Sequence, residues 1–264
     1  MVAMNHYETY VRKAVETGAD FIVSGAGLPL ELPAMVSDTD IAIAPIVSSA
    51  RATALILKYW EKKYHRYPDF IVIEGPEAGG HLGFSRKQLE EKMDYDMEIS
   101  EILKLVRVYE KKAERKIPVA VGGGICDKAR AEHEFMLGAD LIQVASRFIT
   151  TKECDADSAY KDAYLKAQKE DIVLVSSPVG MPGRAIRNPF LEHVEKGEVQ
   201  RPQKCFGCLK HCNPAEIPYC ITEALIHAVK GDTENGLLFC GAQGFLANQI
   251  ETVQDVMEDL LGGL

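Results

Sequence analysis

The sequence predicts an α/β protein whose core is a parallel β-sheet. Short apolar runs alternate with longer amphipathic segments along the first 150 residues. Strand, helix, strand at this spacing is typical of parallel strands joined by right-handed crossovers. The runs are continuous in apolar and β-branched residues, as expected of strands that are buried on both faces. Six runs are candidate strands, at residues 1–4, 20–27, 41–49, 69–75, 117–124 and 140–148.

The segments between these runs have the spacing of apolar residues that predicts amphipathic helices. Two of them end in a Gly-Ala-Asp sequence, at residues 18–20 and 138–140. The glycine can adopt the left-handed conformation that closes a helix, and the aspartate then leads into the next apolar run. The predicted helices cover residues 7–17, 49–63, 99–115 and 128–137.

After Thr150 this alternation stops. The remaining sequence predicts a mixed region rather than further strand-and-helix units. Its predicted parts are a helix near 158–168, an apolar run at 171–177, a loop rich in Pro, Gly and Arg at 178–189, a cysteine-rich stretch at 201–213, and two final helices.

Composition and charge exclude several classes of function. The chain has 264 residues, of which 47% are hydrophobic and 26% charged, as in a globular protein with a sizeable core. A net charge of −9 argues against nucleic-acid or anionic-membrane binding, because both need a concentrated basic surface. No apolar stretch approaches the roughly 20 residues of a membrane helix, and no signal-peptide pattern is present. Seven cysteines without an export signal predict reduced thiols, so we expect a cytoplasmic protein.

The stretch EGPEAGGHLGF, from Glu74 to Phe84, is the first candidate functional segment. It follows an apolar run at the point where parallel sheets place their functional loops. Gly79 and Gly80 lack a Cβ and permit a sharp turn or the close approach of a ligand. His81 titrates near neutral pH and is therefore a candidate acid–base residue. The alternative is an ordinary loop that carries a surface histidine.

Two further strand ends carry small residues that suit a phosphate site. The sequence VAVGGGI runs from a predicted strand through Gly123 and Gly124 towards a predicted helix, which exposes backbone N–H groups. The next predicted strand ends in Ala145 and Ser146. In β/α barrels, the loops after the last two strands frequently form the phosphate site together. The alternative is that the glycines only permit tight strand-to-helix turns.

Taken in order, EGPEAGGHLG, VAVGGGI and IQVASRF resemble the motifs of the FMN-dependent nitronate monooxygenases, formerly called 2-nitropropane dioxygenases. The sequences SGAG at 24–27 and SPVGMPGRAIRN at 177–188 support this resemblance, which covers essentially the whole chain. It implies a (β/α)8, TIM-barrel-like fold and an FMN cofactor. It also implies an enzyme that oxidises alkyl nitronates with O2 to carbonyl compounds and nitrite.

Two other functions stay open. The flavin-dependent enoyl-ACP reductases share this fold and the position of the histidine, so an NAD(P)H-dependent enoyl-thioester reductase is one alternative. A barrel that binds a phosphate-bearing ligand without flavin turnover is the other.

The resemblance also implies roles for individual residues. His81 would face the flavin and the substrate, as a general base or as a hydrogen-bond donor to the nitro group. Glu74 stands where a glutamine is common in the family, which leaves its role as a donor to the flavin open. The implied cofactor contacts run from the flavin ring to the phosphate and comprise Glu74, Gly79, Gly80, Gly123, Gly124, Gln143, Ala145 and Ser146.

The chain departs from the family pattern at its start. Members begin with two βα units that include a Gln-Gly-Gly-Met turn around the flavin, and this sequence resembles the family from the third strand onward. Six strands cannot close an eight-stranded barrel, so we expect an incomplete barrel with free edges at residues 1–4 and 141–144 and weak FMN binding by this chain alone. A separate chain is one source of the missing strands. Residues 1–150 would form the partial FMN-binding barrel, and residues 151–264 would complete the same domain with helices, the Arg-rich loop and a cysteine-bearing extension.

The cysteines suggest a second cofactor. The spacing Cys205-x2-Cys208-x3-Cys212-x7-Cys220 suits a four-cysteine iron–sulfur or zinc site, since thiolates on one loop can converge on an ion. In a chain without an export signal, such a cluster favours a metal over disulfides. The alternative is that the four thiols are small buried side chains.

Overall fold

A five-stranded parallel sheet forms the centre of the protein in the computed structural model, which describes residues 1–91 and 93–262. All neighbouring strands are parallel. Five of the six predicted strands are therefore confirmed. Within the described residues the sheet stays open, with β1 and β6 as its edges, as predicted for an incomplete TIM-barrel-like fold. Its strands follow the order β1 (Phe21–Ser24), β2 (Ala42–Val47), β3 (Ile71–Glu74), β5 (Val119–Gly122) and β6 (Leu141–Gln143).

Residues 1–4 do not form the strand that the sequence predicts. Met4 makes only an isolated antiparallel bridge with Leu209, and the Val2 N–H donates to the Gly25 carbonyl at 2.9 Å. An apolar run becomes a strand only where it pairs with a neighbouring strand over several residues. Here Val2 and Ala3 donate to Gly25 and Ala26 in the loop after β1, and Met4 donates back to Met1. The segment therefore pairs with no strand, and the edge of the sheet is β1.

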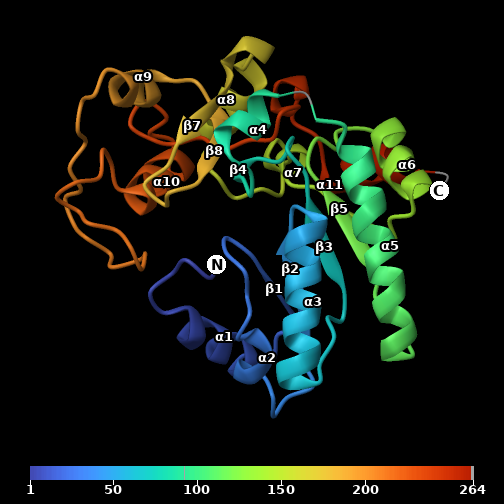
Figure 1. Ribbon diagram of the computed structural model, residues 1–264. Coiled ribbons are helices and arrows are strands. Elements are labelled where there is room, and N and C mark those ends of the chain that lie inside the picture. The colour runs from blue at the N-terminus through green and yellow to red at the C-terminus, as the bar shows by residue number, and fades with distance from the viewer. Residues whose placement is uncertain (92, 263–264) are drawn as a thin grey trace.

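The helices between the strands lie close to the predicted ranges. The predicted glycine caps are confirmed, because Gly18 and Gly138 have φ angles of 76° and 109° at the ends of their helices. Helices α3 and α5 pack against one another along the sheet (Figure 1). The helices of this half are α1 (Tyr7–Glu16), the short α2 (Leu32–Met35), α3 (Ala50–Tyr64), α5 (Tyr95–Ala113) and α6 (Lys128–Leu137).

The largest apolar core joins the sheet to these helices. Trp60 of α3 is fully buried, and its indole N–H donates to the Pro29 carbonyl at 3.2 Å. Full burial of a large apolar side chain stabilises the folded protein by roughly 1.5–3 kcal/mol. Because the core side chains of β2, β3 and β5 are almost completely buried, the carboxyl ends of these strands are held firmly in place.

A second, three-stranded antiparallel sheet has the order β4 (Gly80–His81), β8 (Pro182–Ile186) and β7 (Ile172–Ser176). The sequence predicts residues 182–186 as loop, and this prediction is wrong. Pro and Gly are poor strand formers, but the proline takes the first position of the strand, where it is tolerated. The middle strand, β8, pairs with the Gly-Gly-His turn, because Gly80 of β4 lies opposite Arg184. This pairing connects the turn to the second half of the chain.

The remaining elements gather at the carboxyl ends of the parallel strands, at the top of the view in Figure 1. In the described part of the chain, no helix combines the length and the apolarity that crossing a membrane requires. These elements are α4 (Arg86–Glu90), α7 (Ser146–Ile149), α8 (Ser158–Lys166), the 3-10 helix η1 (Lys169–Asp171), α9 (Pro189–Glu195), α10 (Ile221–Val229), the 3-10 helix η2 (Gly244–Leu246) and α11 (Val253–Leu261).

Candidate functional site

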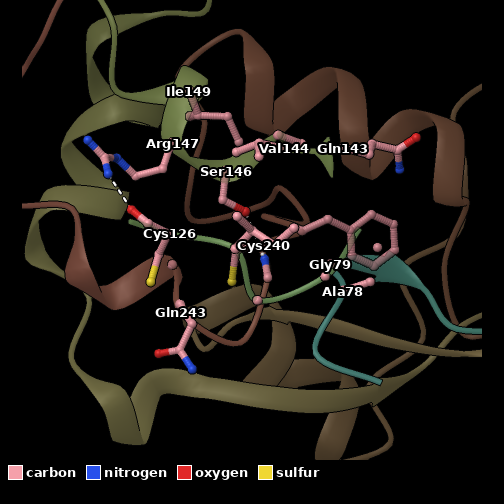
Figure 2. A pocket seen from close by; sticks show the side chains of 18 of the residues that line it. Ala78, Gly79, Cys126, Gln143, Val144, Ser146, Arg147, Ile149, Cys240 and Gln243 are labelled. Carbon is pink, nitrogen blue, oxygen red and sulfur yellow. Dashed lines mark hydrogen bonds between the residues drawn. The ribbon is translucent and has the colours of Figure 1, made fainter. Parts of the chain in front are cut away.

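A cavity of about 250 Å³ opens at the carboxyl ends of β3, β5 and β6 (Figure 2). Neighbouring parallel strands end at the same edge of a sheet, so residues that are distant in sequence meet there. All the residues for which the sequence implies a cofactor contact line this one cavity: Glu74, Gly79, Gly80, Gly123, Gly124, Gln143, Ala145 and Ser146.

The segment 239–247 forms a wall of the cavity that sequence reasoning missed. It lies against the Gly-Gly-His turn, and the Ala242 N–H donates to the Glu77 carbonyl at 2.9 Å. An ideal Cβ on Gly79 would lie 2.5 Å from the carbonyl carbon of Cys240, so the two backbones are in direct contact. The glycine-rich sequence FCGAQG was the available signal. The lining residues of this segment are Phe239, Cys240, Gly241, Gln243, Gly244 and Ala247.

The loop after β5 presents backbone donors to the cavity. Gly123 and Gly124 have φ angles of 110° and 75°, a conformation that favours glycine. Counting only described residues, the N–H groups of positions 123–126 donate to no carbonyl or side chain. Ser146 Oγ accepts the Gly241 N–H at 2.9 Å, which leaves its hydroxyl hydrogen free to donate. Several free donors around small residues suit an anion such as a phosphate.

Several charged groups next to this loop are already paired, but the Glu77 carboxylate, whose Oε2 would clash with an ideal Cβ on Gly124, has no ion-pair partner among the described residues. Asp127 caps α6, because its Oδ1 accepts the Arg130 N–H at 2.8 Å, so the helix end itself is occupied. Arg147 forms ion pairs with Glu251 at 3.0 Å and Asp259 at 2.7 Å. It also donates to the Cys126 carbonyl (Figure 2). An anion here would therefore rely on loop amides and a hydroxyl rather than on a free cation.

His81 lies beside the cavity, on β4, immediately after the lining residue Gly80. Its Nε2 is 2.7 Å from the hydroxyl of Ser177, and its ring centroid is 5.0 Å from that of Phe239, which lines the cavity. Burial lowers the pKa of His81, so the imidazole is neutral at neutral pH. A neutral ring held by one hydrogen bond can accept or donate a proton through its other nitrogen.

Burial disfavours the charged forms of two groups that line the cavity away from the loop at residues 123–126. Burial raises the pKa of Glu74 to about 7 and that of the Cys240 thiol to about 12. The nearby Arg184 guanidinium does not ion-pair with either group. It donates instead to the carbonyls of Pro76 and Ala78, at 2.7 and 2.5 Å, and so holds the loop between β3 and β4.

The four candidate metal-binding cysteines lie together but are not arranged as a metal-binding group. Across residues 1–91 and 93–262, no group of three or more His, Cys, Asp or Glu residues is arranged to hold a metal ion. The four thiols line one separate cavity of about 80 Å³, and burial followed by the nearby thiols of Cys208, Cys205 and Cys220 raises the pKa of Cys212. Cys208 and Cys212 also pack against an apolar cluster, and Cys220 is buried. Small packed side chains stay the alternative for Cys208, Cys212 and Cys220, whereas Cys205 is exposed, and the metal site stays a prediction.

Comparisons with known proteins agree with this arrangement. A probable nitronate monooxygenase of Staphylococcus aureus (strain Newman) is 31% identical over 134 residues, which are 51% of this chain and 36% of that protein. The fold is similar to that of FabK from Thermotoga maritima, with a TM-score of 0.74 and 24% identity over 97% of this chain and 71% of that chain. It is also similar to nitroalkane oxidase from Streptomyces ansochromogenes, with a TM-score of 0.70 and 19% identity over 96% of this chain and 67% of that chain.

Family membership follows from the sequence over nearly its full length. The profile described as nitronate monooxygenase matches residues 1–263. The members of this family are in general FMN-dependent oxidoreductases. This protein belongs to the nitronate monooxygenase family.

Proposed function

We propose that this protein binds FMN in the 250 Å³ cavity and oxidises alkyl nitronates with O2 to carbonyl compounds and nitrite. One observation carries the proposal. The residues expected to contact the cofactor come from three strand ends and the Gly-Gly-His turn, and all of them line the same cavity. Membership of the nitronate monooxygenase family supports the choice of substrate class.

The donors around the cavity fit the phosphate of FMN. The free N–H groups of residues 123–126 and the hydroxyl of Ser146 would hold it, and the glycines would let the backbone approach closely. The segment 239–247 would supply a further wall of the FMN site. Bound FMN supplies the electron chemistry between substrate and O2, while the protein supplies binding, orientation and proton transfer.

His81 is the proposed acid–base residue. Its neutral ring can accept a proton from a nitroalkane or donate a hydrogen bond to the nitro oxygens of a nitronate. The Ser177 hydroxyl engages Nε2, which fixes the plane of the ring and leaves Nδ1 available for the substrate. Ser177 would therefore be a positioning residue rather than a reacting one.

Anaerobic mixing tests this function. Protein loaded with FMN should lose its yellow colour when an alkyl nitronate is added without oxygen, and should regain it with nitrite release when air is admitted. Bleaching by NADH without any response to the nitronate would instead indicate an enoyl-thioester reductase. A folded protein that takes up no FMN would indicate a barrel that binds another phosphate-bearing ligand.

A further inference from the structure

Glu74 is held rigidly at the edge of the cavity. It is the last residue of β3, it lies opposite Gly122 of β5, and the Tyr95 hydroxyl donates to its carbonyl at 3.2 Å. The side chain lines the cavity that we assign to FMN. Backbone pairing holds Glu74 in place, and its half-buried side chain keeps the carboxyl group at this edge of the cavity.

The carboxyl group has no partner of its own. Among the described residues, none donates a hydrogen bond to it, and burial alone accounts for the change in its acidity. The cations nearest the cavity are engaged elsewhere, Arg147 with two carboxylates and Arg184 with loop carbonyls. The other titratable groups that surround this end of β3 bring no positive charge at neutral pH: Tyr95 and Glu98 of α5, Glu134 of α6, Cys126, Cys240 and the neutral His81.

An unpaired carboxylate in such a place is unfavourable, because burial of an ion without a partner costs far more than burial of a neutral acid. The neutral acid carries one O–H donor, which also needs an acceptor. The cavity itself supplies none to Glu74 among the described residues, whereas a flavin ring carries carbonyl oxygens and ring nitrogens that accept hydrogen bonds. The missing acceptor is thus of the kind that the proposed cofactor brings.

On the basis of the proposed flavin site, we propose that Glu74 is a neutral carboxylic acid that donates a hydrogen bond to the bound flavin ring. At pH values where Glu74 of the free protein is ionised, binding of FMN is then accompanied by the uptake of one proton. FMN affinity is highest below the pKa of about 7 that burial gives Glu74 in the free protein, and it falls as the pH rises above that value.

The test compares FMN binding by the wild-type protein and Glu74→Gln at pH 6.5 and pH 8.5, with quenching of flavin fluorescence as the readout. The amide of glutamine donates a hydrogen bond at both pH values. We expect the dissociation constant of the wild-type protein to rise roughly tenfold or more over this interval, since two pH units span the loss of one proton. Glu74→Gln should lack this rise and should bind FMN more tightly than the wild type at pH 8.5.

Ionisation of the FMN phosphate affects both proteins equally, so the difference between them isolates Glu74. The matched control is Glu90→Gln, which removes an exposed carboxylate of α4 that pairs with Arg86 at 3.1 Å, outside the cavity, and should keep the wild-type pH dependence. Infrared difference spectra provide an independent readout: a protonated carboxyl band should change when FMN binds and should be absent from Glu74→Gln.

Two results would overturn the proposal in distinguishable ways. If the wild-type protein and Glu74→Gln bind FMN with the same pH dependence, the flavin site stands and the role of Glu74 is wrong. If folded wild-type protein binds no FMN at either pH, the proposed flavin site is wrong, and the role of Glu74 with it.

Discussion

Replacement of Gly79 by alanine places a methyl group where two backbones leave no room for it. The added Cβ would lie 2.5 Å from the carbonyl carbon of Cys240 and 2.6 Å from the nitrogen of Gly241. Because real Cβ atoms do not approach closer than 3.0 Å, the segment 239–247 must move away from the Gly-Gly-His turn by about 0.5 Å or more. Both sides of this contact line the cavity, so the displacement changes the shape of the proposed flavin site.

The loss of stability in Gly79→Ala can be estimated from the overpacking. The new methyl group meets backbone atoms, which cannot rotate away as a side chain can. Such changes cost about 1–3 kcal/mol, and we expect the free energy of unfolding of Gly79→Ala to fall by an amount near the upper end of that range. We assume that about half of this free-energy cost weakens FMN binding, because the displaced segment lines the site. Since 1.4 kcal/mol corresponds to a factor of ten, the affinity for FMN should fall about tenfold.

Urea unfolding and FMN fluorescence titration measure the two effects separately. The matched control is Gly18→Ala, at the end of α1, where φ is 76° and no atom lies within 4 Å of the added Cβ. This control should lose roughly 1–2 kcal/mol through left-handed strain alone and should keep the wild-type FMN affinity. Wild-type stability and affinity in Gly79→Ala would show that the segment 239–247 does not shape the site.

Three further substitutions test other parts of the account. His81→Ala should keep its FMN but lower turnover of a nitronate by roughly 10²- to 10⁴-fold, and full activity in the flavin-loaded variant would remove His81 from the mechanism. Gly124→Val should weaken FMN binding and also cost about 1–3 kcal/mol of stability, because φ is 75° and the new Cβ would lie 2.9 Å from Cβ of Glu77; unchanged affinity by titration would place the phosphate elsewhere. Arg184→Met removes the donor to two loop carbonyls and should lower the free energy of unfolding by about 1–3 kcal/mol. An unchanged urea midpoint would show that Arg184 does not hold the loop between β3 and β4.

The sequence predicts the parallel sheet well because its strands are buried on both faces. Such strands need continuous apolar runs, which are uncommon in other elements. Residues 1–4 have the same composition but no single neighbouring strand to accept their N–H groups, and composition alone cannot show this. The opposite error occurs at 182–186, where Pro and Gly predict a loop. Pairing on both sides with β4 and β7 overrides that local preference.

The candidate site divides in the same way. Residues at strand ends could be predicted to meet, because the order of parallel strands brings their carboxyl ends to one edge. The segment 239–247 reaches the cavity from far along the chain. Its glycines are compatible with close backbone contact, but the packing of Gly79 against Cys240 is what places it at the site. The cysteine spacing suggested a shared ion. The four thiols do line one small cavity, but no metal-binding group is arranged among the described residues, so the metal site stays a prediction.

Nitrite release under air tests the central claim most directly. Protein saturated with FMN is mixed with an alkyl nitronate, and nitrite and oxygen are followed together, with flavin-loaded His81→Ala as the control. We predict that nitrite appears as oxygen is consumed, and that both changes slow strongly in the variant. A flavin-loaded protein that consumes no oxygen and releases no nitrite with a nitronate, but oxidises NADH in the presence of an enoyl thioester, would contradict the proposed function.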